Sequence, residues 1–226
     1  MTRPDGYTGD VTPGGPPDVH ELPGLRITKL SVGDFDNNVY LLRCARTGDT
    51  VLVDAATDAE RILSFVGDGR LTTVVQTHGH WDHVRAINDV VAATGARLVC
   101  HRYELPLMPE GSAPDPVDDG ARIPVGANSV RGIHLCGHTP GGLALLYDAD
   151  GALADSPHLI SGDSLFPGGP GNTEKDPARF ARLMDDLEAK VFGPLPDATW
   201  IYPGHGKDTT LGAERPSIPE WRTRGW

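Results

Sequence analysis

The feature that most constrains this chain is the stretch "THGHWDH", Thr77–His83, which one glutamine separates from the apolar run "LTTVV". It places four metal-competent side chains within six residues: His78, His80, Asp82 and His83. Along extended backbone alternate side chains share a side, so His78 and His80 point together, while Asp82 and His83 follow where a helix begins. Imidazole and carboxylate ligands suit zinc or, less selectively, iron or manganese. The stretch therefore predicts two neighbouring metal positions at the end of a strand.

Three later residues have the same setting, because each follows an apolar run and lies beside glycine. They are His138 in "LCGHTPGG", Asp163 in "LISGDSLF" and His205 in "WIYPGHGK". Glycine lets the backbone and a ligand approach a shared site closely. Each residue alone is explained equally well as part of a turn. Together with the histidine stretch, they predict one shared metal site.

The hydrophobic pattern predicts interleaved strands and helices in both halves of the chain. Strands are expected at residues 25–32, 37–44, 49–56, 71–75, 97–100, 129–135, 143–147, 158–161 and 199–202. Helices are expected within residues 58–66, 84–94 and 177–192. This order favours an α/β fold in which two mixed β-sheets pack together under outer helices.

The N-terminal residues differ from the rest in composition. Residues 1–22 are rich in proline and glycine and are expected to form a flexible arm, with residues 23–226 as a single domain. The N-terminus lacks the apolar stretch of a signal peptide, and no segment approaches the roughly 20 apolar residues of a membrane span. Cys44, Cys100 and Cys136 are interpreted as reduced thiols, which predicts a cytoplasmic protein.

The charge balance indicates the class of partner. The chain has 20 basic and 31 acidic residues, a net charge of −11 at pH 7, and no basic run. This balance argues against nucleic acid and membrane surfaces and favours a small-molecule substrate. The oligomeric state is left open. A purely structural metal module would need a closed site, whereas these ligands, shared between two ions, leave open positions.

The order of these residues resembles the signature of the metallo-β-lactamase superfamily, a His-x-His-x-Asp-His loop followed by His, Asp and His. The match spans roughly Leu25 to Arg215. The resemblance implies an αβ/βα sandwich with a two-metal site on one edge. It implies that one ion is held by His78, His80 and His138, that the other is held by Asp82, His83 and His205, and that Asp163 bridges them. Asp54, which ends "TVLVD", resembles a buried aspartate that orients a ligand, although a strand-end cap explains it equally well.

Two further segments indicate the branch of the superfamily. The segments "GDSLFPGGPGNTEKDPARF" and "YPGHGKDTTLGAERP" look like those of glyoxalase II-like thioesterases and the related persulfide dioxygenases. Asp163 stands where the β-lactamases usually carry Cys or Ser. Leu165 and Phe166 follow it, where acyl-homoserine lactonases usually place a tyrosine. The helical domain that follows in larger glyoxalase II enzymes is not seen, so the carrier thiol stays open.

The resemblance implies hydrolysis through two metal ions, which would share a water and lower its pKa toward about 7. Asp82 and Asp163 are the catalytic candidates, since either carboxylate could steer the proton of that water. The predicted substrate is a thioester of a low-molecular-weight thiol. One alternative is an iron-dependent persulfide dioxygenase that uses His78, His138 and Asp163; another is a lactone or other ester hydrolase.

No residue of the sequence is assigned to substrate binding. Trp81 lies within the metal loop, where it lines a pocket or simply packs against its neighbours. Arg85 and Lys207 could meet a substrate carboxylate, but a solvated surface charge explains either of them better. Arg85 and Ala86 also replace the glycines usual after the loop, and Cys136 replaces a common proline.

Overall fold

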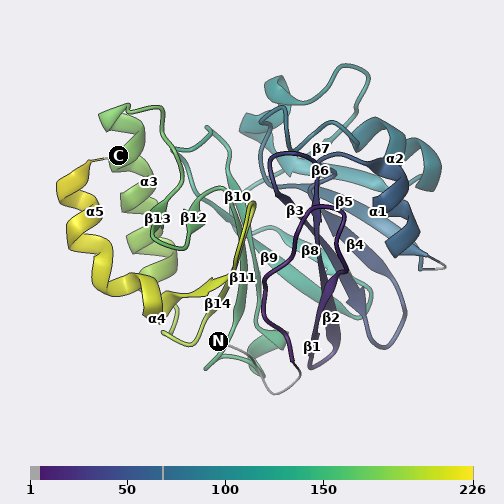
Figure 1. The fold of residues 1–226 in the computed structure, drawn as a ribbon, viewed down its shortest axis with the longest axis horizontal. Coiled ribbons are helices and arrows are strands. Elements are labelled where there is room, and N and C mark those ends of the chain that lie inside the picture. The colour runs from purple at the N-terminus through teal and green to yellow at the C-terminus, as the bar shows by residue number, and fades with distance from the viewer. Residues whose placement is uncertain (1–5, 68, 226) are drawn as a thin grey trace.

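Two β-sheets face each other in the computed structural model, which describes residues 6–67 and 69–225 (Figure 1). The first sheet has seven strands in chain order: β1 (Asp18–Leu22), β2 (Leu25–Val32), β3 (Asn37–Cys44), β4 (Thr50–Val53), β5 (Leu71–Gln76), β6 (Arg97–His101) and β7 (Asp115–Val117). The second has six, in the order β15 (Thr209–Thr210), β14 (Trp200–Pro203), β11 (His158–Gly162), β10 (Leu143–Tyr147), β9 (Asn128–His134) and β8 (Arg122–Val125). A two-stranded ribbon pairs β12 (Leu165–Phe166) with β13 (Gly169–Pro170).

Helices cover the outer faces of both sheets (Figure 1). The first sheet carries α1 (Ala59–Val66) and α2 (Ile87–Thr94), and the second carries α3 (Pro177–Leu187), α4 (Leu211–Glu214) and α5 (Ile218–Arg224). Short helical turns complete the chain: η1 (Arg102–Leu107), η2 (Ala149–Gly151), η3 (Glu188–Phe192) and η4 (Arg215–Ser217). The predicted αβ/βα sandwich is therefore confirmed.

Central strands are apolar on both faces because both faces are covered. In β4, Val51 and Val53 belong to the cluster between the sheets, whereas Leu52 packs under α1 and α2. A third cluster, which includes Phe180 and Trp221, lies between the second sheet and its helices. This burial explains why these strands read as continuous apolar runs rather than alternating ones.

The N-terminal segment corrects the prediction of a flexible arm over residues 1–22. Residues 1–5 lie outside the described part, but Asp18–Leu22 forms strand β1, which pairs antiparallel with β2. Tyr7 is fully buried, and its ring stacks on His20 at 4.4 Å between centroids. The prediction was wrong because one aromatic ring and one strand pairing order a segment that is otherwise rich in proline and glycine.

Other elements differ in detail from the sequence prediction. The helix expected over residues 84–94 begins at Ile87, and the strand expected over 49–56 ends at Val53. The short strand β8 and the C-terminal helices α4 and α5 were not predicted. Within residues 6–67 and 69–225, every helix is too short or too polar to cross a bilayer.

One edge of the sandwich collects the loops that carry the candidate ligands. β4, β5 and β6 run parallel in the first sheet, and β11 and β14 run parallel in the second. Their carboxyl ends therefore point the same way within each sheet. His78 follows β5, Asp163 follows β11 and His205 follows β14.

Candidate metal centre

Six of the predicted ligands form two compact groups. The first triad is His78, His80 and His138, and the second triad is Asp82, His83 and His205. Within each triad, the candidate ligand atoms all lie within 4.8 Å of one another. The structure thus brings together side chains from loops that lie about 60 residues apart in the first triad and more than 120 apart in the second.

Asp163 lies between the two triads. Its Oδ2 is 3.9 Å from His78 Nε2 and 3.4 Å from His138 Nε2, both in the first triad. In the second triad, Oδ1 is 3.6 Å from His83 Nε2 and Oδ2 is 3.4 Å from His205 Nε2. One carboxylate therefore faces both groups, which is the position that a bridging ligand needs.

Hydrogen bonds at Nδ1 fix the orientation of the histidine rings. His138 Nδ1 donates to the carbonyl of Asn172 at 2.7 Å, and His205 Nδ1 donates to the carbonyl of Phe35 at 2.7 Å. His83 Nδ1 donates to Asp54 Oδ2 at 3.1 Å. Each bond leaves Nε2 directed at the centre, as is usual for metal-binding histidines.

Asp54 supports both triads from beneath. It is buried with φ at +59°, and its carboxylate accepts from Thr77 N and Thr77 Oγ1, each at 2.7 Å. Because the Thr77 hydroxyl donates to Asp54, its oxygen accepts from His78 Nδ1 at 3.0 Å. Asp54 therefore orients His83 directly and His78 through Thr77, and it also caps the end of β4.

The donor set fits a bound cation. His78 Nε2, His138 Nε2 and Asp163 Oδ1 are buried without a hydrogen-bond partner among the described residues. Most buried polar atoms in proteins are paired. In the second triad, His83 Nε2 and His205 Nε2 point at each other at 2.9 Å, which suits two ligands of one ion. A cation in each triad would satisfy these atoms.

Gly204 makes room for the bridging carboxylate. A Cβ at this position would lie 2.0 Å from Asp163 Oδ1 and 3.0 Å from His83 Cε1. Any other residue here would displace one of the two side chains. The glycine before His205 is thus required by the close approach of backbone to the centre.

Burial and charge set the protonation of these groups. Burial lowers the pKa of His78 well below its usual value, and burial also lowers that of His138. Burial alone would raise the pKa of Asp163, but the imidazoles of His83 and His78 outweigh it and hold the pKa well below its usual range. In the second triad, burial alone would lower the pKa values of His83 and His205, but the nearby Asp163 carboxylate outweighs it and raises both, that of His83 to about 9. Metal binding requires neutral imidazoles and an ionised carboxylate, so an ion at the second triad would displace protons from these rings.

Glu104, which the sequence analysis missed, holds the two loops of the first triad together. It is fully buried in η1, and its carboxylate accepts from Gly79 N at 2.7 Å and Gly141 N at 2.5 Å. Gly79 lies between His78 and His80, and Gly141 lies three residues after His138. Nothing in "HRYELP" distinguishes this glutamate from a surface charge.

Two more supporting residues were also missed. Arg179 of α3 donates through Nε to the carbonyl of Gly137 at 2.9 Å and through Nη2 to the carbonyl of His138. Asn37 Nδ2 donates to Asp82 Oδ2 at 2.9 Å. These contacts fix a ligand of each triad, but they join segments that are distant in sequence.

The remaining candidate residues lie at the surface. Trp81 is 57 % exposed, meets the Phe35 ring edge-on, and carries the Arg85 guanidinium 5.1 Å from its ring centroid. Lys207 forms an ion pair with Asp10 at 2.8 Å. Both cations therefore have partners within the protein.

The three cysteines are free thiols. Cys44 and Cys100 are buried, and Cys136 is partly exposed.

Comparison with known proteins identifies the family. The sequence profile described as "Metallo-beta-lactamase superfamily" matches residues 32–205, which contain both triads and Asp163. The chain belongs to this superfamily. Metal-dependent hydrolases with dinuclear metal centres are typical of this superfamily.

Curated relatives carry a more specific name. The hydroxyacylglutathione hydrolase of Fuscovulum blasticum is 35 % identical over 175 residues, which cover 75 % of this chain and 62 % of that protein. A hydroxyacylglutathione hydrolase-like protein of Gallus gallus is 35 % identical over 184 residues, covering 80 % of this chain and 61 % of the relative. This chain thus spans about three-fifths of the length of these two relatives.

Solved structures share the fold over most of the chain. TTHA1623, solved in a di-iron-bound form, has 30 % sequence identity and a TM-score of 0.70, covering 85 % of this chain and 98 % of that one. ETHE1 from Myxococcus xanthus has 28 % identity and a TM-score of 0.72, covering 85 % and 83 %. These likenesses agree with the layered sheets described above.

Proposed function

We propose that the protein is a dinuclear metal-dependent hydrolase that cleaves a thioester of a low-molecular-weight thiol. The observation that carries the proposal is the position of Asp163 between two triads whose inward nitrogens include buried atoms without partners. Zinc is the expected metal, with iron and manganese as alternatives. The relatives named hydroxyacylglutathione hydrolase support a thioester, since an acyl group on glutathione is carried by its sulfur.

The reaction is RC(O)SR′ + H₂O → RCOOH + R′SH. Water attacks the carbonyl carbon, a C–O bond forms, the C–S bond breaks, and the thiol leaves with a proton. Two bound ions would supply Lewis-acid polarisation of the carbonyl and activation of the attacking water. His78, His80 and His138 would hold one ion, Asp82, His83 and His205 the other, and Asp163 would contact both.

Asp82 is the residue best placed to handle the proton. Its side chain is 15 % exposed, whereas that of Asp163 is 9 % exposed between the triads. Asn37 Nδ2 donates a hydrogen bond to Asp82 Oδ2, which fixes the orientation of this carboxylate. A carboxylate fixed in this way can accept the proton of the attacking water and pass it to the leaving thiolate.

Metal analysis combined with a substrate screen tests this proposal. Protein saturated with zinc should contain two ions per chain and should hydrolyse S-lactoylglutathione or an analogue on another thiol. Lactones, phosphodiesters and nitrocefin serve as comparison substrates. Fewer than two ions after saturation would contradict the dinuclear centre, and lactone turnover without thioester turnover would favour the ester hydrolase alternative.

The likeness to ETHE1 fits a second candidate, an iron-dependent persulfide dioxygenase. Such an enzyme needs only two histidines and one carboxylate around iron, which His78, His138 and Asp163 could supply. The complete second triad argues against it. An oxygen electrode separates the two: a zinc form inert toward thioesters, with an iron form that consumes O₂ in proportion to glutathione persulfide, would replace the hydrolase proposal.

A further inference from the structure

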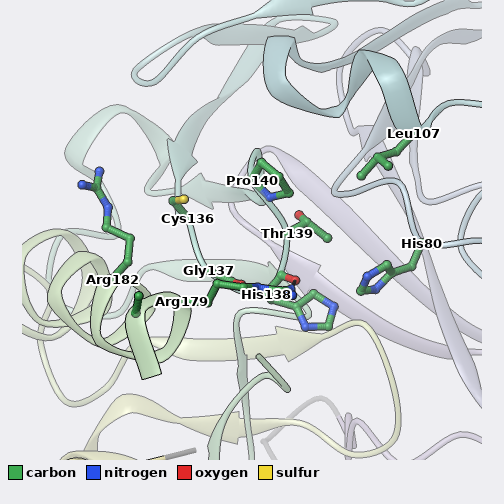
Figure 2. A pocket seen from close by; sticks show the side chains of 10 residues that line it. His80, Leu107, Cys136, Gly137, His138, Thr139, Pro140, Arg179 and Arg182 are labelled. Carbon is green, nitrogen blue, oxygen red and sulfur yellow. Dashed lines mark hydrogen bonds between the residues drawn. The ribbon is translucent and has the colours of Figure 1, made fainter. Parts of the chain in front are cut away.

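A cavity of about 550 Å³ opens directly beside the first triad. His80 and His138 line one end, and Cys136 and Arg182 line the other, with Thr139 and Pro140 between them (Figure 2). Leu107, Ala178 and the ring of Pro140 make much of its wall apolar. Its volume lies within the range of small-molecule sites.

The two arginines of this cavity have different partners. Arg179 already has partners within the protein, because it donates to the carbonyls of Gly137 and His138 and forms an ion pair with Glu174 at 2.7 Å. Arg182 contacts Asp186 through Nε at 3.3 Å, and its side chain is 58 % exposed. Among the described residues, its Nη1 and Nη2 have no partner.

The charge around Arg182 leaves a net positive end to the cavity. Asp186, the one carboxylate that forms an ion pair with Arg182 within residues 6–67 and 69–225, also pairs with Lys190 at 3.2 Å and accepts from Cys136 N at 2.9 Å. Two cations thus share one anion there. The unpaired Nη1 and Nη2 groups of Arg182, at the end of an apolar cavity, suit an anionic group that can accept two parallel hydrogen bonds.

A buried hydroxyl along the channel also lacks a partner. Thr139 lines the cavity, is 2 % exposed, and its Oγ1 makes no hydrogen bond within the described residues. An unpaired buried hydroxyl carries a desolvation cost.

We infer that this cavity binds one arm of the substrate and that Arg182 pairs with a carboxylate or phosphate at the end of that arm. The inference rests on the proposed function, because the reacting carbonyl would lie at the His80 and His138 end. It assigns the substrate class as an anionic thioester: short, apolar next to the reacting bond, and negatively charged at its far end. Arg182 would then set specificity without taking part in the chemistry.

Four thioesters test the inference on the zinc-loaded protein. S-acetyl-N-acetylcysteamine is neutral. S-succinyl-N-acetylcysteamine carries a carboxylate on the acyl arm, and S-acetyl-3-mercaptopropionate carries one on the thiol arm. S-acetyl-2-mercaptoethyl phosphate carries a phosphate on the thiol arm. Arg182→Gln should raise KM about fivefold or more for at least one anionic substrate, with kcat unchanged and the neutral substrate unaffected. Arg182→Glu should raise KM further, and Arg182→Lys should restore part of the loss.

Arg70→Gln is the matched control, because Arg70 precedes β5 at the end opposite His78 and its side chain is 81 % exposed. It removes the same charge and should leave every KM unchanged. Equal KM values for Arg182→Gln and wild type with all anionic thioesters would overturn the inference. A similar rise for neutral and anionic substrates would overturn it as well.

A binding measurement keeps the two proposals separate. Two thioethers cannot be hydrolysed: S-(2-oxopropyl)-3-mercaptopropionate carries the carboxylate on the thiol arm, and S-(4-carboxy-2-oxobutyl)-N-acetylcysteamine carries it on the acyl arm. Calorimetry should show that Arg182→Gln weakens the binding of at least one of them about fivefold but not that of its neutral amide. If wild type hydrolyses no thioester yet shows this charge-dependent binding, the proposed function fails and the anion site stands. If wild type hydrolyses thioesters but shows no charge-dependent binding, the proposed function stands and the anion site at Arg182 fails.

Discussion

The two triads offer the same number of ligands but are supported differently. The side chains of His78 and His138 in the first triad are 2 % and 8 % exposed, whereas those of Asp82 and His205 in the second are 15 % and 25 % exposed. The first triad is tied together by a single carboxylate, Glu104, which lies between its two loops. The second has no such clamp among the described residues and depends on several distant segments.

The support of the second triad comes largely from the N-terminal third of the chain. The buried amine of Lys29 donates to the carbonyls of Gly9 and Gly206 and pairs with Asp208 at 2.6 Å. Tyr7 also donates to Asp208 at 2.7 Å. The loop that follows His205 is thus braced by residues far away in sequence. The two ions, if bound, would therefore be lost through different structural failures.

Removing the residue that both triads share should have the largest effect. Asp163→Asn keeps the shape of the side chain but removes the charge that faces four imidazoles. We expect kcat/KM for the thioester to fall about a thousandfold, equivalent to about 4 kcal/mol, while circular dichroism stays near native. Asp155→Asn, at an exposed position, is the control. Activity within about tenfold of wild type would argue against the bridge.

Lys29→Met should damage the second triad selectively. It leaves Asp208 buried without its cation, and breaking a buried ion pair in this way costs about 3–5 kcal/mol. Urea denaturation measures that loss, and zinc titration should show weaker binding of one ion while the other is retained. Lys207→Met removes an exposed cation from the same loop and should change little. Equal loss of both ions would remove the distinction between the triads.

Glu104→Gln should damage the first triad instead. An amide can accept from only one of Gly79 N and Gly141 N and presents a donor to the other, which costs about 1–3 kcal/mol. The affinity for the ion at the first triad should fall about tenfold. Glu110→Gln, on the exposed surface, provides the comparison. A variant that loses stability but keeps both zinc affinities would show that Glu104 has no positioning role.

The convergence of the candidate ligands could be predicted from the sequence because they lie in short motifs at the ends of apolar runs. His78, Asp163 and His205 each follow a strand whose runs of Val, Leu and Ile mark it plainly. Their supports could not be predicted. Glu104 and Lys29 are charged residues whose burial is decided by contacts between distant segments, and no local pattern separates them from surface residues.

The same limit explains the errors in the fold. Residues 1–22 were predicted to be flexible on composition, yet Tyr7 is buried by contacts with residues from the C-terminal half. Helices α4 and α5 are short, and their proline and glycine residues hid the apolar positions Leu211 and Trp221. The strands were easier, because burial on both faces leaves long apolar runs. The expected compartment and the absence of nucleic-acid or membrane partners stay predictions.

The smallest effect should come from replacing the three cysteines together. If the reaction runs through the two triads alone, no thiol acts as a nucleophile, and the combined variant Cys44→Ala, Cys100→Ala, Cys136→Ser should keep kcat within several-fold of wild type. Burial raises the pKa of Cys100 to about 12, so this thiol stays protonated and inert at neutral pH. Cys136 lines the cavity, and its replacement should affect KM more than kcat. Steady-state kinetics with zinc content measured in parallel checks this, and a collapse of kcat with both ions retained would mean that a covalent step on sulfur had been overlooked.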